Sequence, residues 1–559
     1  MFYRYEHNNM DETTPLMIRP QQGPQTGQLP WDPRRSCIAG VLVLITLTLE
    51  RLAFYALVAN LFLFLSLGRW SPDSGMTAVL LLVGVAHFSA LGGGWLADAW
   101  IGRYWALVAG LSLYVVGFSL LTAAAAGVLC NPANSTSPFC VTEMYAIIIC
   151  VGFAAGTVRA NFPSFGAEQV KYGGTDSLRR FFNWYYWCVN IGSLLGVGAL
   201  SYVALDMPNG FLRAFAGTCG CLIVALILFA CGRPYYLVHR PAGSVLMNIL
   251  CILCEAISGR CHLRRQTSIQ SSPLIERRSQ RPVTSPSWLD YAKIRYGGSH
   301  HDAAVEDVKK LGIVLLLFTS LLPYWLVFFQ IETGFQEQGV HLKIGFEKNF
   351  NMPTAWLSLF DQIFILALIP VMNSVIYPYF DRHGYRVTLL SRIAFGMSFS
   401  FMAAIAAGVL EFLSIYQWKH GNRVTQVIHN VTYNASDMSL LWQVPQYCLV
   451  GTAEVFAGVA GLEFAYSAAP RPLQGVAMGM FSAMEGIGSL LGTALISALS
   501  PTWIRKDSQH FQGHLDYYFF LLAGIQGWAL AIFTLWLLVK RVREMNSTPT
   551  PPPEPAPVS

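Results

Sequence analysis

The sequence predicts an all-α membrane protein with twelve transmembrane helices in two six-helix bundles, and three observations support this. Of the 559 residues, 54% are hydrophobic and only 12% are charged, about half the charged share of a soluble protein. The mean hydropathy is +0.44. Apolar runs of roughly 20 residues recur, each long enough to cross a hydrocarbon core of about 30 Å. This composition argues against a cytosolic enzyme and against a nucleic-acid binder.

The apolar runs are expected to be helices because lipid offers no partner for an open strand edge. Each run is also too long for a barrel strand of about 10 residues. The first run follows a polar stretch, residues 1–36, that lacks the features of a cleavable signal peptide. The predicted helices cover residues 37–64, 77–97, 104–128, 143–163, 182–203, 211–231, 309–331, 354–376, 387–411, 440–467, 471–499 and 516–540.

The connections between the predicted helices differ in basic charge, which predicts the orientation. Lys and Arg concentrate in cytosolic connections, so the basic side is expected to be cytosolic and to hold both termini. The opposite loops, 131–140 and 412–437, contain the sequons at Asn134, Asn430 and Asn434, which are candidate glycosylation sites. The basic side is defined by Arg34, Arg35, Arg103, Lys171, Arg179, Arg180, Arg382, Arg386, Arg471, Lys540, Arg541 and Arg543.

Cys130 and Cys140 flank the first of these opposite loops. A disulfide between them is one interpretation in an oxidising compartment, and two free thiols are the other.

The polar segment 232–308 divides the chain into two halves of six spans each. The expected organisation is a tail at 1–36, bundles at 37–231 and 309–543, a cytosolic linker at 232–308 and a tail at 544–559. The linker is rich in Arg and Ser, and it is expected to be mostly disordered, with a short amphipathic helix near 243–257. It is either a solvated tether or a regulatory, phosphorylated segment.

The two halves repeat a short pattern in a cytosolic turn. Asp98, Gly102 and Arg103 follow the second span, and Asp381, Gly384 and Arg386 follow the eighth. An Asp can cap a helix and pair with Arg, while Gly allows a tight reversal. The pattern resembles the loop motif of the major facilitator superfamily, whose two halves rock about a midplane site. The resemblance implies gating roles for Asp98, Arg103, Asp381 and Arg386.

Ionisable residues inside the spans are costly, so they usually face a partner or a cavity. Each one alone is as readily explained by a structural salt bridge or an interfacial position. Together, acids in both halves and a base in the first half predict a polar cavity that suits a zwitterionic ligand. The residues are Glu50, Arg51, His87, Arg159, Glu332, Asp361, Glu454, Glu463 and Glu485.

Several longer motifs, in order along the chain, resemble those of the proton-coupled oligopeptide transporters and of their peptide/histidine transporter branch. The first is Leu47-Thr-Leu-Glu50-Arg51-Leu-Ala-Phe54-Tyr55. The others lie at 161–169, 181–192, 323–325, 442–446 and 461–470. The similarity extends from about residue 36 to about residue 540.

This resemblance implies a role for each matching residue. Arg159 would bind the carboxylate of a peptide, and Asp361 and Glu454 would hold its amino group. Asn190, Tyr55, His87 and Trp325 would complete the substrate site. Protons are the coupling ion, and no other cofactor and no metal is expected. The candidate proton-coupling residues are Glu50, Arg51, His87, Glu332 and Glu485, while Glu463 is expected to be structural.

The sequence departs from the family pattern at several of these positions. Leu47 replaces the first glutamate of the motif, and His87 stands where relatives usually have Tyr. Glu332 lies about one turn beyond the position where many relatives carry an acid. Proton coupling is therefore hypothesised to be redistributed among Glu50, His87, Glu332 and Glu485. The alternative for His87 is a neutral, hydrogen-bonding replacement for Tyr.

The N-terminal tail carries Glu12, Leu16 and Met17 in an arrangement that resembles an acidic dileucine sorting signal. With the branch resemblance, it predicts a multi-pass protein of the endosomal and lysosomal membrane. The expected function is a symporter that moves histidine, di- and tripeptides and, by the branch resemblance, bacterial muropeptides to the cytosol. Sorting adaptors and cytosolic adaptor proteins are the expected protein partners, with no nucleic acid.

Two other functions stay open. One is transport of a different small anion such as nitrate, against which the retained acids Asp361 and Glu454 argue. The other is a signalling scaffold or sensor that recruits cytosolic adaptors and transports little. An enzyme is not expected, because no nucleophile–base set and no metal-ligand spacing is present.

Overall fold

The computed structural model is almost entirely helical over the residues that it describes. These are residues 32–66, 70–130, 137–239, 241, 245–267, 287–296, 298–347, 350–383, 388–428, 431–470, 473–504 and 513–547.

The first half of the chain forms six long helices, and all six spans predicted for it are confirmed. Five of them extend beyond the predicted run at one or both ends, because helical turns continue into the polar borders, whereas the third ends at Ala125, three residues before its predicted end. The second helix continues through η1 (Ala97–Ile101), and the fifth continues through η3 (Gly196–Leu200) into α6 (Ser201–Asp206). The long helices are α1 (Pro33–Ser66), α2 (Pro72–Leu96), α3 (Arg103–Ala125), α4 (Pro138–Val170), α5 (Thr175–Leu195) and α7 (Gly210–Cys231).

In the second half, the seventh span is bent. Helix α9 (Asp302–Ser320) meets the segment Leu322–Val340 at 42°, where Pro323 removes a backbone donor and favours a kink. That segment consists of α10 (Leu322–Phe328), η7 (Phe329–Glu332) and α11 (Gly334–Val340). With this pair taken as one span, the described residues contain up to 12 helices long and apolar enough to cross a membrane, as predicted.

Two further spans of the second half, the eighth and the tenth, are also interrupted. The eighth runs through α12 (Leu357–Val371), η9 (Met372–Ile376) and α13 (Tyr377–Arg382). The tenth is made of α15 (Val444–Ala453), η11 (Glu454–Gly458) and α16 (Val459–Ala468), so that Glu454 opens a π-helical turn, a local distortion frequent at functional sites. The others are α14 (Leu389–Lys419), α17 (Gln474–Leu499) and α18 (Leu515–Ser547).

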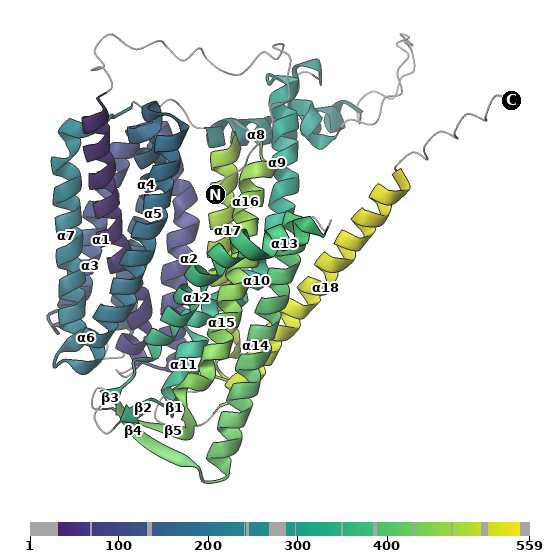
Figure 1. Ribbon diagram of the computed structural model, residues 1–559. Helices are drawn as coiled ribbons and strands as arrows, with labels where there is room; N and C mark the ends of the chain where they lie inside the picture. The colour runs from purple at the N-terminus through teal and green to yellow at the C-terminus, as the bar shows by residue number, and fades with distance from the viewer. Residues whose placement is uncertain are drawn as a thin grey trace.

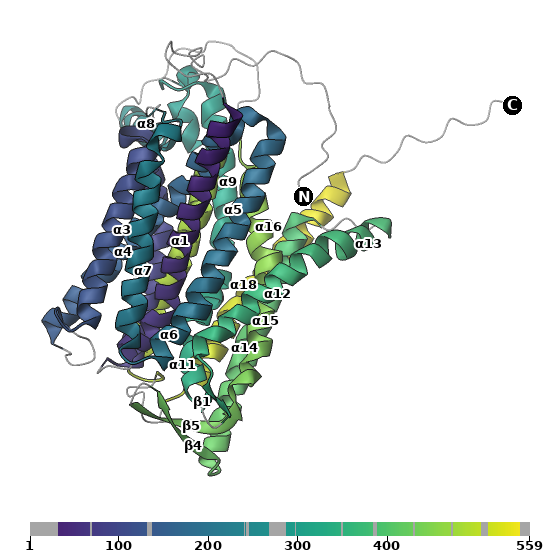
Figure 2. The same cartoon turned by 60° about the vertical axis from the view of Figure 1, so that its left-hand side comes forward.

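The two halves form two bundles that lie side by side (Figures 1 and 2). Helix α2 of the first bundle packs along α17 of the second, and small residues permit the close approach. A Cβ added at Gly84 would lie 2.7 Å from Cγ of Leu490, and one at Gly486 would lie 2.6 Å from the backbone nitrogen of Phe88. The seam between the bundles therefore depends on glycine at both positions.

One end of the molecule, here called the hairpin side, carries a small sheet that the sequence did not predict. Strand β4 (Arg423–Ile428) pairs antiparallel with β5 (Val431–Ser439), and Arg423 lies opposite Ser436. Strand β1 (Leu342–Lys343) pairs parallel with β5, and β2 (Gly345–Glu347) pairs with β3 (Phe350–Asn351). The expected loop 412–437 is thus the end of α14 followed by a hairpin (Figure 1).

The opposite end, here called the linker side, carries the described parts of segment 232–308. We expected this linker to be mostly disordered, but those parts are folded. Helix α8 (Val245–Thr267) includes the predicted amphipathic helix near 243–257, and it is followed by η5 (Trp288–Ala292) and η6 (Ile294–Tyr296). Burial of apolar side chains against α9 and α17 stabilises this part of the linker.

The start of the linker is bound to the first bundle. The Gln169 amide nitrogen donates to the Leu237 carbonyl over 3.1 Å, and the Leu237 N–H donates to Gln169 Oε1 over 2.7 Å. Arg35 donates to the carbonyl oxygen of Pro234 over 2.6 Å. Since α8 packs on the second bundle, the linker joins both bundles on this side.

Candidate functional site

The first bundle contributes a buried ion pair from adjacent residues of α1. Arg51 Nε lies 2.6 Å from Glu50 Oε2, and Arg51 Nη2 lies 2.7 Å from Glu50 Oε1. Glu50 is fully buried and Arg51 is 4% exposed. A pair with two parallel hydrogen bonds can be held out of water, because each charge satisfies the other.

A second cation, Arg159 of α4, lies near this pair. Its guanidinium carbon is 5.1 Å from the centre of the Phe54 ring, and that of Arg51 is 5.4 Å from the same ring. Arg159 Nη1 contacts Nε2 of His87 on α2. The buried Nε of Arg159 has no hydrogen-bond partner among the described residues. Arg159 therefore retains a donor for an incoming anion.

His87 connects the two bundles. Its Nδ1 is 2.9 Å from the carbonyl oxygen of Val83, so in the neutral ring Nδ1 carries the hydrogen and Nε2 is the acceptor. Nε2 lies 3.3 Å from Oε2 of Glu485 on α17. The imidazole is also 5.8 Å from the ring of Phe329 in the second bundle. A positive charge on His87 would therefore interact with Arg159 of the first bundle and with Glu485 of the second.

The second bundle contributes the acids Asp361 and Glu454 to the site. Asp361 of α12 is 6% exposed, and its Oδ1 has no hydrogen-bond partner among the described residues. A Cβ at Gly451 would lie 2.6 Å from that oxygen, so Asp361 packs closely on α15. Glu454 is half-buried at the start of η11.

Glu485 of α17 lies beside the cation of the first bundle. Its Oε2 is 3.3 Å from His87 Nε2, and the same nitrogen contacts Nη1 of Arg159. Through His87, Glu485 therefore connects the second bundle to Arg159.

Three further residues predicted for the substrate site differ from one another in burial and in hydrogen bonding. Trp325 is 5% exposed within an aromatic group, 5.7 Å from the ring of Phe481, and its Nε1 has no hydrogen-bond partner among the described residues. Tyr55 is half-buried on α1, edge-on to Phe54. The Asn190 amide nitrogen donates to the Tyr186 carbonyl over 2.8 Å, which leaves its oxygen for a ligand.

Glu332, a candidate for proton coupling, lies at the end of η7. Its Oε2 accepts a hydrogen bond from the Gln336 amide nitrogen over 3.2 Å. Its described partner is thus a neutral amide in the next helical turn, whereas His87 and Glu485 contact each other directly.

The expected gating residues are placed for only one of the two turns. Arg103 Nε donates to Asp98 Oδ1 over 3.0 Å, and Nη1 donates to Glu168 over 2.6 Å. Glu168 therefore joins this cluster, which its motif position alone did not indicate. Gly102 has φ +80°, which favours glycine at the turn.

In the second turn, Arg386 and the side chain of Asp381 lie outside the described residues. A neighbouring contact is defined: Arg392 Nη1 donates to Glu463 Oε2 over 2.8 Å. Glu463 thus has the salt bridge that a structural role implies.

Several predicted sites lie outside the described residues. These include the sorting residues and two of the three sequon asparagines, whereas Asn434 lies in β5 and is partly exposed. The residues outside are Glu12, Leu16, Met17, Asn134 and Asn430.

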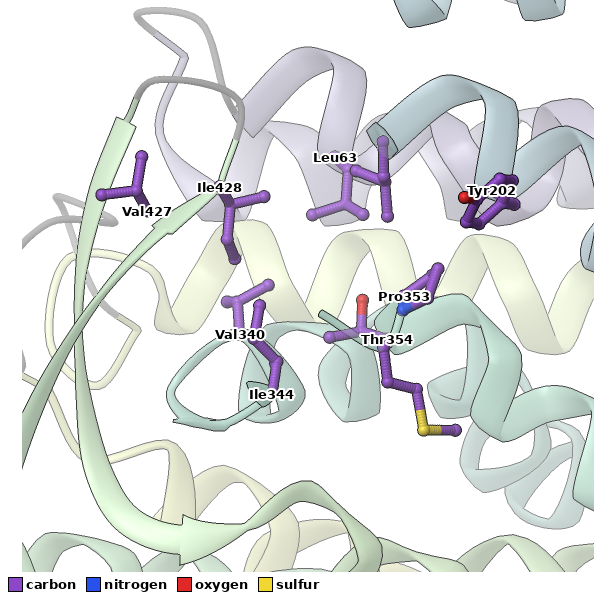
Figure 3. A pocket seen from close by; sticks show the side chains of 10 residues that line it. Leu63, Tyr202, Val340, Ile344, Pro353, Thr354, Val427 and Ile428 are labelled. Carbon is purple, nitrogen blue, oxygen red and sulfur yellow. The ribbon is translucent and has the colours of Figure 1, made fainter. Parts of the chain in front are cut away.

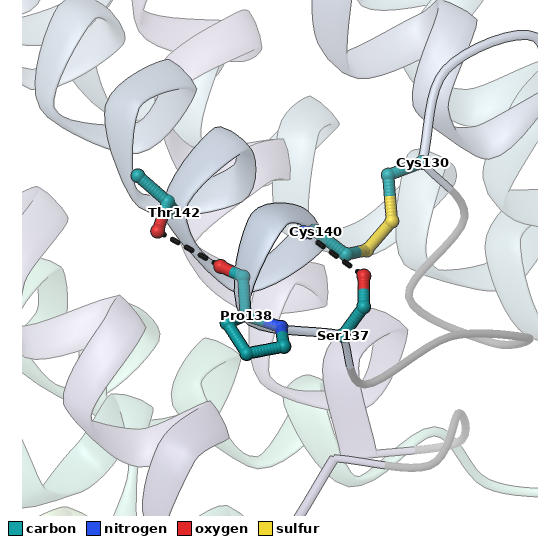
Figure 4. The surroundings of a disulfide bond; sticks show 5 residues. All are labelled: Cys130, Ser137, Pro138, Cys140 and Thr142. Atoms are coloured by element: carbon teal, nitrogen blue, oxygen red, sulfur yellow. Dashed lines mark hydrogen bonds between the residues drawn. A yellow bond between two sulfur atoms is a disulfide. The ribbon is translucent and has the colours of Figure 1, made fainter.

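Cys130 and Cys140 form a disulfide, with 5.3 Å between their Cα atoms (Figure 4). This selects one of the two interpretations left open by the sequence. Cys140 lies in the first turn of α4, where its N–H donates to the side chain of Ser137 over 3.3 Å. The disulfide and this cap fix the start of α4.

Polar and aromatic contacts join the two bundles on the hairpin side. The Trp356 Nε1 donates to the carbonyl oxygen of Gly198 over 3.0 Å, and its ring lies 6.2 Å from that of Tyr202. Ser500, after α17, hydrogen-bonds to Asp73 at the start of α2. Helices α5 and α12 lie close together near this end and diverge toward the linker side (Figure 2).

A small pocket lies within these contacts, and most of the side chains that line it are apolar (Figure 3). No charged side chain lines it, so it does not fit a zwitterionic ligand. We regard it as part of the packing that closes this side. The lining residues are Leu63, Tyr202, Leu205, Val340, Ile344, Met352, Pro353, Thr354, Val427 and Ile428.

The sequence reasoning also missed a buried pair near the sheet. His341 Nε2 lies 3.5 Å from Oε1 of Glu337, and both residues are almost completely buried. Their four-residue spacing at a helix end was the available signal. Over the part of the chain that is described, no group of three or more His, Cys, Asp or Glu side chains could hold a metal ion.

Comparison with known proteins supports the same interpretation of the fold. A family model described as the POT family matches residues 104–508 of the chain. "Solute carrier family 15 member 3" of Rattus norvegicus is 33% identical, over 92% of this chain and 94% of that protein. "Protein NRT1/ PTR FAMILY 8.1" of Arabidopsis thaliana is 29% identical, over 87% of this chain and 90% of that protein.

Solved structures resemble the whole architecture. The in meso crystal structure of the POT family transporter PepTSo has a TM-score of 0.68 at 20% identity, and covers 92% of this chain and 99% of that chain. A POT family transporter in complex with 5-aminolevulinic acid has a TM-score of 0.62 at 15% identity, over 89% and 95%. At these identities the likeness shows the fold alone, and it confirms the predicted major facilitator fold.

Proposed function

Because the chain belongs to the POT family of transporters, we propose that it is a symporter that carries protons together with histidine and di- or tripeptides. Members of this family are transporters and not enzymes. We further propose that the route leads from the endolysosomal lumen to the cytosol, and that bacterial muropeptides are among the substrates.

The observation that carries the proposal is the division of charge between the bundles. Arg159 in the first bundle keeps a buried donor without a partner, and Asp361 in the second keeps a buried acceptor without a partner among the described residues. An unsatisfied buried polar group costs about 1–3 kcal/mol. A zwitterion removes both costs, because its carboxylate meets Arg159 and its amino group meets Asp361 and Glu454.

A site that recognises the two charged ends of the substrate makes few specific contacts with its side chains. Such a site accepts a broad range of short peptides. Recognition of both ends also argues against a simple anion as the substrate. An anion has no amino group to hold, and it would approach two acids that repel it.

The contact of His87 with both Arg159 and Glu485 supports a mechanism for proton coupling. A proton on His87 is repelled by the guanidinium of Arg159 and attracted by the carboxylate of Glu485. When a substrate carboxylate neutralises Arg159, that repulsion weakens and a protonated His87 paired with Glu485 becomes more favourable. Binding of substrate and binding of a proton would then reinforce each other.

The direction of transport rests on the sequence and on the closed hairpin side. If that side faces the lumen, as the sequons and the basic side imply, the contacts of Trp356 and Ser500 must open for loading. In the arrangement described here α5 and α12 instead diverge toward the linker side (Figure 2), an arrangement that would release substrate to the cytosol.

The experiment is uptake of a radiolabelled dipeptide and of histidine at about pH 5.5 and about pH 7.5. The protein is redirected to the plasma membrane by substituting Glu12, Leu16 and Met17. We expect uptake that is faster at the lower pH and that falls steeply in Glu454→Gln.

Glu463→Gln is the matched control, since this acid lies on the same span but pairs with Arg392. Its uptake per molecule at the surface should stay near wild type. An absence of substrate-dependent uptake, with cytosolic adaptors still recruited, would replace the proposal by the scaffold function.

A further inference from the structure

Helix α8 has one apolar face turned into the protein. Ile249, Ile252 and Ala256 are buried there, at 3%, 2% and 0% exposure. They pack with Val305 and Val308 of α9 and with Leu473, just before α17. These partners lie at the linker-side ends of spans, so α8 is fixed against the second bundle at its linker-side end.

A second, polar contact sets the rotation of the helix. The carboxylate of Glu255 accepts hydrogen bonds from the Ser299 N–H over 2.7 Å and from the Ser299 hydroxyl over 2.8 Å. His300 Nε2 lies 3.1 Å from the same carboxylate. With 100° between successive residues, Glu255 and the exposed Asn248 share one face, distinct from the buried one.

The remaining face of α8 is apolar and exposed. Leu250 is 45% exposed and Ile257 is 56% exposed, and the thiols of Cys251 and Cys254 are exposed between them. Positions 250, 251, 254 and 257 follow the spacing of one helix stripe. A second apolar stripe on a helix that already buries one is not needed for packing, so it indicates another contact surface.

The surroundings of this stripe favour a membrane surface as its occupant. Helix α8 lies across the linker-side ends of the bundles, whereas α9 runs along them (Figure 1). An amphipathic helix in this position buries its apolar face about 5–10 Å into the headgroup and acyl boundary. Arg260, Arg264 and Arg265 follow the stripe in the sequence, and such basic residues favour an anionic cytosolic leaflet.

We propose that α8 lies on the cytosolic leaflet with Leu250, Cys251, Cys254 and Ile257 toward the acyl chains, and that Cys251 and Cys254 are S-acylation sites. The proposal uses the cytosolic orientation of the linker side and does not depend on which substrate is transported. Cysteines of amphipathic helices on a membrane surface are sites of reversible S-acylation with long-chain acyl groups.

The modification is a thioester exchange with a long-chain acyl-coenzyme A. The cysteine sulfur attacks the thioester carbonyl, a new sulfur–carbon bond forms, and the bond from that carbon to the sulfur of coenzyme A breaks. Coenzyme A leaves as the thiol with the proton that the cysteine gave up. Nothing is oxidised or reduced.

The acyl chain would add a second attachment to the linker. The linker is already bound to the first bundle at Leu237 and packed on the second bundle through α8. Only residues 240–244 separate His239 from Val245, a span of at most about 20 Å. An anchored α8 would keep this short connection at the bilayer while the bundles move.

The first experiment is acyl exchange on the full-length protein in cells. Free thiols are blocked, thioesters are cleaved with hydroxylamine, and the thiols released are tagged with a maleimide polymer that shifts the band on a gel. We expect a hydroxylamine-dependent shift that is lost in C251A/C254A and kept in C37A/C231A, a control that removes two other exposed thiols. Cys261, seven residues after Cys254, is substituted separately.

The second experiment measures the depth of the stripe. A bimane fluorophore is attached to a cysteine at position 250, or at position 248 as the control, in purified protein reconstituted with brominated anionic lipid. We expect quenching at 250 and much less at 248. The proposal is overturned by a wild-type protein without the shift, by a shift that persists in C251A/C254A or depends only on Cys261, or by equal quenching at both positions.

Discussion

The two halves of the candidate site solve the burial of charge in different ways. In the first bundle, Glu50 and Arg51 satisfy each other through two hydrogen bonds, and Arg159 contacts His87. In the second, Asp361 leaves one oxygen without a partner among the described residues. The charges of the first half are therefore largely paired without a ligand, whereas the described residues offer Asp361 no cation, which a substrate can supply.

The largest effect on stability is expected in the paired half. Glu50→Gln leaves Arg51 buried without its counter-ion, and breaking a buried pair costs about 3–5 kcal/mol. We expect a clear fall in the apparent Tm of the purified protein, measured by intrinsic fluorescence in detergent. Asp98→Asn is the control, because this acid pairs with Arg103 but its side chain is 46% exposed. Equal Tm values for wild type and Glu50→Gln would show that the Glu50–Arg51 pair does not stabilise the fold, contrary to this account.

Substitution of the acids of the second bundle should reduce uptake more than stability. Asp361→Asn and Glu454→Gln remove a charge that has no cationic partner among the described residues. We therefore expect the free energy of unfolding to stay within about 1 kcal/mol of the wild-type value, and Tm to stay near that of the wild type or to rise. Peptide uptake should instead fall by about 10- to 100-fold, the value of a charge-assisted hydrogen bond. A loss of Tm as large as that in Glu50→Gln would show that these acids are structural.

The contacts of His87 with Arg159 and Glu485 should determine how uptake depends on pH. His87→Gln removes the group that contacts both Arg159 and Glu485 and keeps a polar side chain. We expect the difference in uptake between about pH 5.5 and about pH 7.5 to shrink, and the double variant with Glu485→Gln to add little. An unchanged pH profile would mean that His87 is a neutral replacement for Tyr.

A smaller effect is expected at a paired cluster outside the membrane. Burial alone would raise the pKa of Asp290, but hydrogen bonds from Lys293 and Lys309 outweigh it and lower the pKa to about 2. A carboxyl whose pKa falls on folding adds stability above its unfolded pKa and loses it as the pH falls through the folded one. We estimate this contribution at about 2 kcal/mol.

Asp290→Asn should therefore lower Tm at neutral pH, and the difference from wild type should shrink between about pH 4 and about pH 2. Thermal unfolding of both proteins across this range measures it. A difference that is constant with pH would indicate a packing effect rather than a titration.

The sequence predicts those features that depend on composition and local order. Span positions followed from the length of apolar runs, whereas the bend next to Pro323 was not predicted from the sequence. The hairpin β4–β5 was missed although residues 431–436 alternate between apolar and polar side chains, because the whole segment was interpreted as a loop between two spans. The folded linker was missed because α8 is stabilised by residues of α9 and α17, which are distant in the sequence.

The site could be predicted as a set of residues but not as a set of contacts. Arg159, Asp361 and Glu454 stand out because charge inside a span is rare. Which acid contacts His87 depends on how α2 packs on α17, and the sequence alone does not fix that packing. The contact between Glu168 and Arg103 was not predicted for the same reason, because it depends on how α3 packs on α4.

The most direct measurement compares blocked and unblocked substrates in the wild type and in Glu454→Gln. The wild type should prefer a free dipeptide over its N-acetylated form by about tenfold or more. Glu454→Gln should lose most of that preference while it still prefers a free carboxylate over the C-terminal amide. If Glu454→Gln keeps the full preference for the free amino group, the second bundle does not hold that end and the account is contradicted.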